Sequence, residues 1–163
     1  MADKIISVVG ATGSQGGGLV RAICEDASGG FRARALTRDP NSEKARALAA
    51  LGAEVVACNV DDETSLRAAC EGSYGVYGVT FFWDHFSPQR EKAQAAAIAG
   101  AAKAAGAQHV IWSTLEDSRR FIPLEDPRMP TLQGQYKVPH FDAKAEADAL
   151  FAALPVTYLL TSF

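Results

Sequence analysis

Short runs rich in β-branched residues alternate along the whole chain with longer stretches of helical character. The runs that predict strands are Ile5–Val9, Phe31–Leu36, Glu54–Ala57, Gly75–Thr80, His109–Ser113 and Val156–Leu160. The stretches that predict helices are Gln15–Glu25, Ser42–Leu51, Asp62–Cys70, Gln89–Ala105 and Asp142–Phe151, with Asp142 as a helix cap and a loop over Glu116–Pro139. Strands separated by helices of this length form right-handed βαβ units. The sequence therefore predicts an α/β fold, a doubly wound parallel sheet of about six strands (a Rossmann fold).

The composition fits one globular domain over residues 1–163, with 48% hydrophobic and 21% charged residues. The net charge is -3 and the basic residues are scattered, which argues against direct binding of nucleic acid. Cys24, Cys58 and Cys70 are too widely spaced for a zinc site, so we expect no metal. The Ala-rich stretch Ala93–Ala107 is too short to span a membrane. Without a signal-peptide pattern at the start, a cytoplasmic protein is expected.

The chain ends in an apolar strand pattern, Pro155–Phe163, that has no polar tail. Chain termini usually lie in solvent and are polar. An apolar final strand suggests either a truncated chain or a sheet edge covered by a protein partner or a second copy.

A glycine-rich loop joins the first predicted strand to the first predicted helix. It carries Gly10, Gly13 and Gly16 at a spacing of three, together with Thr12, Ser14 and Gln15. In such a loop the glycines permit a tight turn, a close approach to a pyrophosphate and close packing of helix on strand. The N-terminus of the helix offers free N–H groups to phosphate oxygens. Because a strand precedes the loop and a helix follows it, the pattern predicts a dinucleotide site rather than a glycine-rich turn without a ligand.

The residues after the second strand indicate which dinucleotide binds. NAD sites usually place an acidic residue here to accept a hydrogen bond from the ribose 2′-hydroxyl, whereas this chain has Thr37, Arg38 and Asp39. The guanidinium of Arg38 suits a 2′-phosphate, and Lys44 adds positive charge nearby. Asp39 could instead pair with Arg38 or bind the 2′-hydroxyl itself. We therefore expect NADP(H) and regard NAD(H) as the less favoured cofactor.

Two further strand ends carry candidate contacts. Asp61, after the third strand, is placed to accept from the adenine amine, while Asp62 is expected to cap the following helix. Thr80 and Phe81, after the fourth strand, are expected beside the nicotinamide ribose. The aromatic run 81–83 either lines a nicotinamide pocket or belongs to the core, and the residues alone do not decide between these.

Several segments together resemble a known family. They are Gly10–Gly17, Thr37–Pro40, Phe82-Trp83, Trp112–Glu116 and Val138–Lys144, and they keep their order across nearly the whole chain. The sequence resembles the NmrA-like family of atypical short-chain dehydrogenases/reductases. Its closest likeness is to the branch of redox sensors that bind NADP(H) and regulate partner proteins, whereas relatives of the isoflavone and quinone reductase types are enzymes.

The resemblance carries mixed implications for catalysis. Active short-chain dehydrogenases use a Tyr and a Lys four residues apart, with a Ser or Thr after the fifth strand. Here His140 stands at the Tyr position, four residues before Lys144, and Ser113 and Thr114 match the hydroxyl position. In the NmrA-like family this substitution accompanies little or no dehydrogenase activity, while Lys144 can still contact the cofactor ribose. Tyr136 precedes His140 by four residues, but it has no lysine at the required spacing.

The resemblance therefore predicts an NADP(H)-binding, redox-responsive regulator with little or no dehydrogenase activity. The alternatives are an NADPH-dependent reductase of a quinone or small carbonyl compound and a truncated remnant that keeps only the fold. Full-length family members continue into a C-terminal region that supplies most of the substrate or partner cleft, and we expect that region to be absent from this chain.

Overall fold

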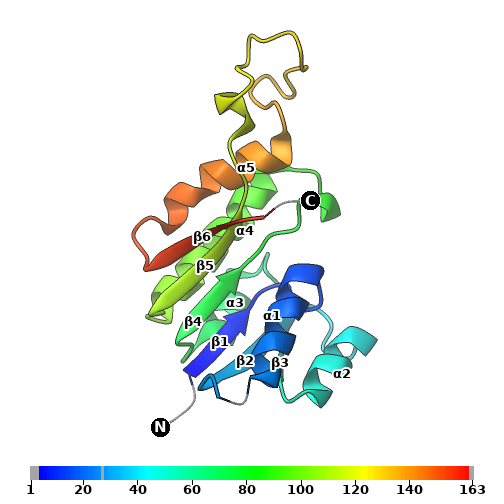
Figure 1. The fold of residues 1–163 in the computed structure, drawn as a ribbon, viewed down its shortest axis with the longest axis vertical. Helices are drawn as coiled ribbons and strands as arrows, with labels where there is room; N and C mark the ends of the chain where they lie inside the picture. The colour runs from blue at the N-terminus through cyan, green and yellow to red at the C-terminus, as the bar shows by residue number, and fades with distance from the viewer. Residues whose placement is uncertain (1–3, 27, 162–163) are drawn as a thin grey trace.

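Six strands form one fully parallel sheet in the computed structural model, which describes residues 4–26 and 28–161. The strands are β1 (Lys4–Val8), β2 (Phe31–Thr37), β3 (Glu54–Ala57), β4 (Gly75–Gly78), β5 (His109–Thr114) and β6 (Val156–Leu160). Their order in the sheet is β3-β2-β1-β4-β5-β6 (Figure 1). Successive strands are added to one side of β1 up to β3 and to its other side from β4 on, which makes the position between β1 and β4 the topological switch point of a doubly wound sheet. The predicted fold is confirmed.

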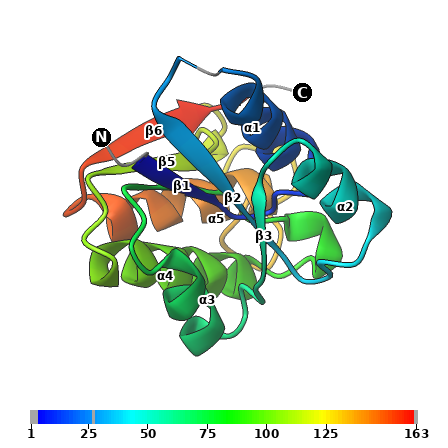
Figure 2. The same ribbon diagram turned by 90° about the horizontal axis from the view of Figure 1, so that it is seen from below.

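Helices cover both faces of the sheet (Figure 2). The α-helices are α1 (Ser14–Glu25), α2 (Glu43–Ala50), α3 (Glu63–Cys70), α4 (Pro88–Ala104) and α5 (Pro139–Ala147). Short 3₁₀ turns are η1 (Phe82–Asp84), η2 (Ser118–Arg120) and η3 (Asp148–Phe151). Successive strand residues point to opposite faces, so Ala35 joins a core with Val20 of α1, and Leu36 joins a core with Ile98 of α4. Neighbouring hydrophobic residues of one strand therefore belong to two separate hydrophobic cores, one on each face of the sheet.

Local signals at helix ends mostly act as the sequence predicts. Asp62 caps α3 by accepting hydrogen bonds from the backbone N–H groups of Thr64 and Ser65. Gly106 follows α4 with a φ of +64°, a conformation that favours glycine and ends the helix. The predicted fourth strand is too long, because β4 ends at Gly78 and Thr80 already lies outside the sheet.

The prediction that Asp142 caps the last helix is wrong. α5 begins at Pro139, which suits a first helical position because proline has no N–H to donate. Asp142 lies in the first turn and is fully buried. Its carboxylate accepts hydrogen bonds from the backbone N–H groups of Lys137 and Val138, and from the backbone and hydroxyl of Ser118. Asp142 therefore fixes the loop before the helix instead of starting the helix.

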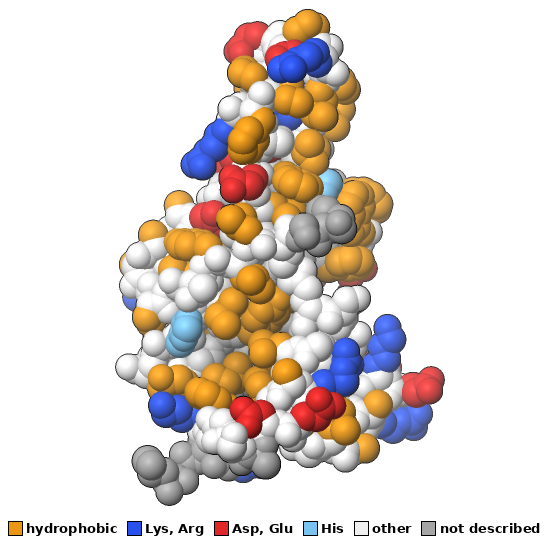
Figure 3. Space-filling model, viewed as in Figure 1, with side chains coloured by type: hydrophobic (Ala, Val, Ile, Leu, Met, Phe, Trp, Pro, Cys, Tyr) orange, Lys and Arg blue, Asp and Glu red, His pale blue; other side chains and the backbone are white. Residues whose placement is uncertain are grey.

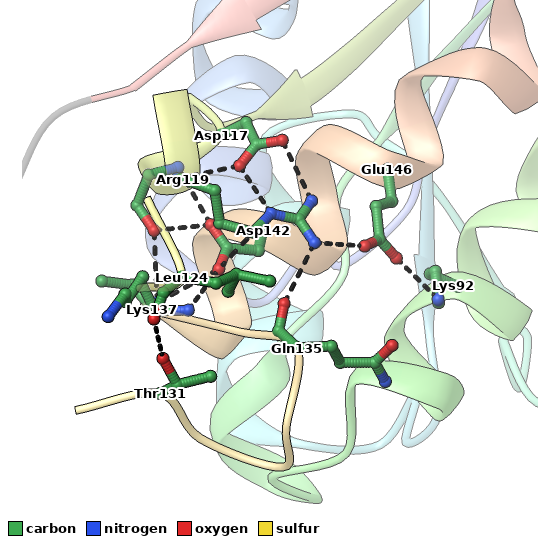
Figure 4. A network of polar contacts seen from close by, with 11 residues as sticks. Lys92, Asp117, Arg119, Leu124, Thr131, Gln135, Lys137, Asp142 and Glu146 are labelled. Atoms are coloured by element: carbon green, nitrogen blue, oxygen red, sulfur yellow. Dashed lines mark hydrogen bonds and ion pairs between the residues drawn. The ribbon is translucent and has the colours of Figure 1, made fainter. Parts of the chain in front are cut away.

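Residues 116–138 form an arm that extends away from the sheet (Figure 1). A network of charged side chains holds its base against α4 and α5 (Figure 4). Arg119 forms ion pairs with Asp117 and with Glu146 of α5, each at 2.8 Å, and Glu146 also pairs with Lys92 of α4 at 2.7 Å. The predicted loop is therefore anchored at its base, with η2 inside it.

In residues 4–26 and 28–161, no helix is long and apolar enough to cross a membrane. The same residues contain no group of three or more His, Cys, Asp or Glu side chains placed to hold a metal ion. The apolar final stretch is described as far as residue 161, where Tyr158, Leu159 and Leu160 of the edge strand β6 are exposed. Residues 162 and 163 lie outside the described residues.

Candidate functional site

A cavity of about 700 Å³ opens at the carboxyl ends of the strands, over the switch point between β1 and β4. This size is typical of sites for small ligands and cofactors. Figure 3 shows hydrophobic side chains gathered on one side of this region and Lys and Arg side chains near α2 on the other. The cavity brings together every site residue that the sequence predicts: Gly10, Thr12, Gly13, Ser14, Gln15, Gly16, Thr37, Arg38, Lys44, Asp61, Thr80, Phe81, Ser113, His140 and Lys144.

The glycine loop has backbone geometry that side chains would disturb. Gly10 has a φ of +66°, which only glycine adopts readily. A Cβ at Gly16 would lie 2.8 Å from the carbonyl carbon of Gly10 and would also collide with its oxygen. Gly16 therefore lets α1 approach the end of β1 closely.

The N-terminus of α1 faces the same cavity. Gly13 is its N-cap residue and supplies no side-chain hydrogen bond to the first turn. The amide of Gly17 already bonds the carbonyl of Gly13, while Ser14, Gln15 and Gly16 in the first turn line the cavity. Uncapped N–H groups and the helix dipole together favour an anion at this position. The loop thus has the features of a pyrophosphate site.

Charged side chains surround the cavity near β2. Arg38 donates a hydrogen bond at 3.0 Å to the carboxylate of Asp84, which comes from η1 across the cavity. Lys44, at the start of α2, also lines the cavity and is exposed. The Thr37 hydroxyl accepts a hydrogen bond from the backbone N–H of Asp39, so it shapes the turn after β2. Asp39 in turn accepts from the backbone of Asn41.

Asp61 is held by two side chains of α4. Its carboxylate accepts hydrogen bonds from the guanidinium of Arg90, at 3.2 and 2.5 Å, and from the amide of Gln94 at 2.8 Å. These contacts, led by the one to Arg90, lower the pKa of Asp61 below its usual value. Asp61 therefore stays ionised and joins β3 to α4 at the cavity wall.

Lys144 of α5 also lines the cavity, and its ammonium has several polar partners. Its ammonium donates to the hydroxyl of Thr80 at 2.8 Å and to the carbonyls of Thr80 and Ser113, each at 3.3 Å. It also lies 3.3 Å from the carboxylate of Glu91, a wholly buried residue of α4. Burial lowers the pKa of Lys144, and the Glu91 charge opposes that decrease. The two oppositely charged groups therefore form a buried pair.

Ser113 and Tyr77 share one acceptor from the glycine loop. The Ser113 hydroxyl donates to the side-chain oxygen of Gln15 at 2.7 Å, and the Tyr77 hydroxyl donates to the same atom at 2.6 Å. Burial raises the pKa of Tyr77, so its hydroxyl keeps its proton at neutral pH. Gln15 thus links α1 to β4 and β5 across the top of the sheet.

His140 lies against an aromatic cluster. Its ring centroid is 4.7 Å from that of Trp83 and 5.6 Å from that of Phe82. Burial lowers the pKa of His140; the negative charges of Glu91 and Asp142 oppose this decrease, and the positive charge of Lys144 adds to it.

Tyr136 is completely buried and is not among the described residues that line the cavity. Of the aromatic run 81–83, Phe82 is buried whereas Phe81 and Trp83 are exposed, and all three line the cavity.

Sequence reasoning missed Glu91, Asp84 and Tyr77. Glu91 looks like an ordinary first-turn acid of a surface helix, and Asp84 has no motif around it. Their partners, Lys144 and Arg38, lie about 50 residues away along the chain. No local signal could have paired them.

Comparisons with known proteins place these features in a family. The model of the NmrA-like family matches residues 2–163. The NmrA-like oxidoreductase notA' of Aspergillus versicolor is 36% identical over 123 residues, which cover 72% of this chain and 34% of that protein. The NmrA-like protein DDB_G0286605 of Dictyostelium discoideum is 30% identical over 147 residues, covering 90% and 44%. The chain therefore spans less than half the length of these relatives.

Solved structures agree in fold. NmrA, a negative transcriptional regulator, in complex with NADP is 25% identical, with a TM-score of 0.73, and the match covers 97% of this chain and 45% of that one. NmrA in complex with NAD gives a TM-score of 0.78 at 24% identity. The match of the family over residues 2–163, on a Rossmann sheet with a glycine loop at its switch point, shows that this chain belongs to the NmrA-like family.

Proposed function

We propose that this chain binds NADP(H) in the cavity and acts as a redox-responsive regulator with little or no dehydrogenase activity of its own. The observation that carries the proposal is the convergence of the glycine loop, Arg38 and Lys144 on one cavity of about 700 Å³. The pyrophosphate would lie on the N-terminus of α1, and the adenosine 2′-phosphate would lie beside Arg38. Lys144 would contact the nicotinamide ribose. The NADP complex of the relative NmrA supports this choice of cofactor.

The packing and protonation of His140 support the proposal of little or no dehydrogenase activity. A general acid or base needs access to the reacting atom and a pKa near the working pH. His140 packs against Trp83 and Phe82, and burial lowers its pKa, so it is mostly neutral at physiological pH and poorly suited to donate a proton. The completely buried Tyr136 cannot replace it without rearrangement of the arm.

Regulation would follow from a difference in affinity between two conformations, since a ligand shifts an equilibrium only by that difference. The partner in this proposal is a protein, and the segments expected to change are the loop Gly52–Ala53 and the arm of residues 116–138. Amide hydrogen exchange measured with and without NADP⁺ tests the arm. If NADP⁺ does not slow exchange in residues 116–138, the arm is not a segment that changes.

Titration calorimetry with NADP⁺ and NAD⁺ tests the cofactor. The wild type is expected to prefer NADP⁺, and Arg38→Ala should weaken NADP⁺ binding roughly ten- to a hundredfold, toward the NAD⁺ level. Arg46→Ala, on the neighbouring helix α2, is the matched control. Failure of the wild type to bind either nucleotide would support a remnant that keeps only the fold.

The alternative is an NADPH-dependent reductase of a quinone or small carbonyl compound. Its specific support is that Ser113, His140 and Lys144 all line the same cavity, and that the relative from Aspergillus versicolor is described as an oxidoreductase. NADPH oxidation measured against a panel of quinones separates the two proposals. Turnover that His140→Ala or Lys144→Ala abolishes would favour the enzyme, whereas a rate equal to that without protein would remove it.

A further inference from the structure

A buried carboxylate lies directly behind the lysine of the cavity. α4 and α5 lie side by side on one face of the sheet (Figure 2), and they bring Glu91 and Lys144 together. Glu91 is 0% exposed and Lys144 is 8% exposed. Lys144 lines the cavity, but Glu91 is not among the described residues that do so. The carboxylate therefore contacts the ammonium of a cavity-lining lysine from the side away from the cavity.

Thr80 completes the arrangement. Its hydroxyl donates to Glu91 at 2.5 Å and accepts from the Lys144 ammonium at 2.8 Å. One oxygen of Glu91 thus receives both the Thr80 hydrogen bond and the Lys144 charge, at 3.3 Å. With the carbonyls of Thr80 and Ser113 as further acceptors, the ammonium is held from several sides in one position.

His85 lies behind the second carboxylate oxygen. The backbone N–H of Ser87 donates to Nδ1 of His85, so a neutral ring carries its proton on Nε2. Nε2 is 3.4 Å from Glu91 Oε2, and neither atom has a hydrogen-bond partner among the residues that the structure describes. The hydrogen bond to the carboxylate therefore lies on its lysine side, while on the histidine side Nε2 is only near it, at 3.4 Å.

A buried ion pair contributes little net stability to a fold. Removing two charges from water costs about as much as their attraction returns, and apolar replacements are often as stable. A pair placed under a cavity wall therefore suggests a role in holding one charge at the cavity. The same conclusion follows from the geometry, because the carboxylate, the hydroxyl and two carbonyls all converge on the lysine.

We propose that Glu91 is a positioning residue that keeps the Lys144 ammonium charged and directed into the cavity. The consequence for the nicotinamide ribose, which Lys144 would contact, rests on the proposed binding of NADP(H). Glu91 itself touches no cofactor. Without the Glu91 carboxylate, only the charge of Asp148 would oppose the effect of burial on the pKa of Lys144, and the lysine would lose its proton at a lower pH.

The first experiment needs no nucleotide. Nuclear magnetic resonance of ¹⁵N-labelled lysine side chains, with Lys144→Met to assign the signal, follows the titration of Lys144. In Glu91→Gln, which keeps the size of the side chain, Lys144 is expected to titrate at lower pH than in the wild type. Glu91→Asp keeps the charge and should restore part of the difference. An unchanged titration in Glu91→Gln would overturn the proposal.

The second experiment compares NADP⁺ with 2′,5′-ADP, which lacks the nicotinamide ribose. Glu91→Gln is expected to weaken NADP⁺ roughly tenfold and to leave 2′,5′-ADP unchanged, because only the dinucleotide reaches Lys144. In a Lys144→Met background the same substitution should have no further effect. Equal losses for both ligands, or a full effect without Lys144, would show a merely structural role. If the wild type binds neither ligand, the proposed function fails while the lysine titration still decides the role of Glu91.

Discussion

The Arg38 guanidinium and the Asp84 carboxylate form an ion pair at 3.0 Å that joins the end of β2 to η1 across the cavity. Both side chains are largely exposed, at 69% and 41%. An exposed pair of this kind contributes only about 0–1 kcal/mol, so an anion of higher charge can displace the carboxylate. Arg38, the residue proposed to bind the 2′-phosphate, is therefore paired with a carboxylate that would compete weakly with that phosphate.

Removing this competitor should favour ligands with a 2′-phosphate. Asp84→Asn is expected to raise the affinity for 2′,5′-ADP by up to about fivefold, since about 1 kcal/mol is released, and to leave 5′-AMP unchanged. Titration calorimetry with the two ligands measures both effects. The matched variant Arg38→Ala should bring 2′,5′-ADP down to the level of 5′-AMP. An equal gain for both ligands in Asp84→Asn would contradict the competition.

Two glycines of α1 should respond oppositely to alanine. Gly16→Ala forces a Cβ against the backbone of Gly10, and overpacking of this kind costs about 1–3 kcal/mol. Nothing lies within 4 Å of a Cβ at Gly18, so Gly18→Ala should stabilise the helix by up to about 1 kcal/mol. Urea denaturation gives both free energies of unfolding. A Gly16→Ala variant as stable as the wild type would mean that α1 does not need close contact with β1.

Asp142 should contribute far more to stability than an exposed acid. Asp142→Ala leaves the backbone N–H groups of Ser118 and Lys137 without their acceptor, and leaves that of Val138 with only the Ser118 hydroxyl; the loss is expected to cost about 3 kcal/mol. The control is Glu63→Ala, which removes an exposed ion pair with Arg67 on α3. This substitution should cost about 0.3–0.5 kcal/mol. Chemical denaturation measures both. Similar losses in the two variants would show that the arm is not anchored through Asp142.

The three thiols should differ in reactivity. Burial raises the pKa of Cys70 to about 12, and Cys70 is completely buried, so it holds almost no thiolate at pH 8. Cys24 is partly exposed. A thiol reagent at pH 8 is therefore expected to label Cys24 first and Cys70 only after unfolding. Cys24→Ser should remove the fast phase, and rapid labelling of Cys70 in the native protein would contradict this assignment.

His140 should make the fold less stable in acid. Because burial lowers its pKa in the folded protein, the unfolded chain binds more protons between the folded value and 6.5. Stability then rises with pH across this window and is lost as the pH falls below about 6.5. Urea denaturation from about pH 7.5 to about pH 5 should show a smaller decrease for His140→Asn than for the wild type. His85 and His109 are present in both proteins, so their contribution cancels in the comparison. An equal decrease in both would contradict the assignment to His140.

Much of the fold follows from local patterns in the sequence. The alternation of β-branched runs with helical stretches predicts the parallel sheet, because strand and helix periodicities are set within a few residues. The glycine loop is local as well, since Gly10 and Gly16 are required by the turn and by the helix that follows it. Asp62 caps its own helix by contacts two and three residues away. The spacing of His140 and Lys144 already places both residues on one helix.

Contacts between distant elements were decided only by the tertiary structure. Glu91 and Lys144 meet because α4 and α5 pack side by side, and Arg38 meets Asp84 because η1 crosses toward β2. Asp61 faces Arg90 instead of open solvent for the same reason. The start of α5 shows the limit most clearly. A capping rule applied to Asp142 sees only its neighbours in sequence, whereas its buried carboxylate also binds Ser118, 24 residues earlier. The sequence determined the elements and the loop that they form, and packing of the elements determined which charges face one another.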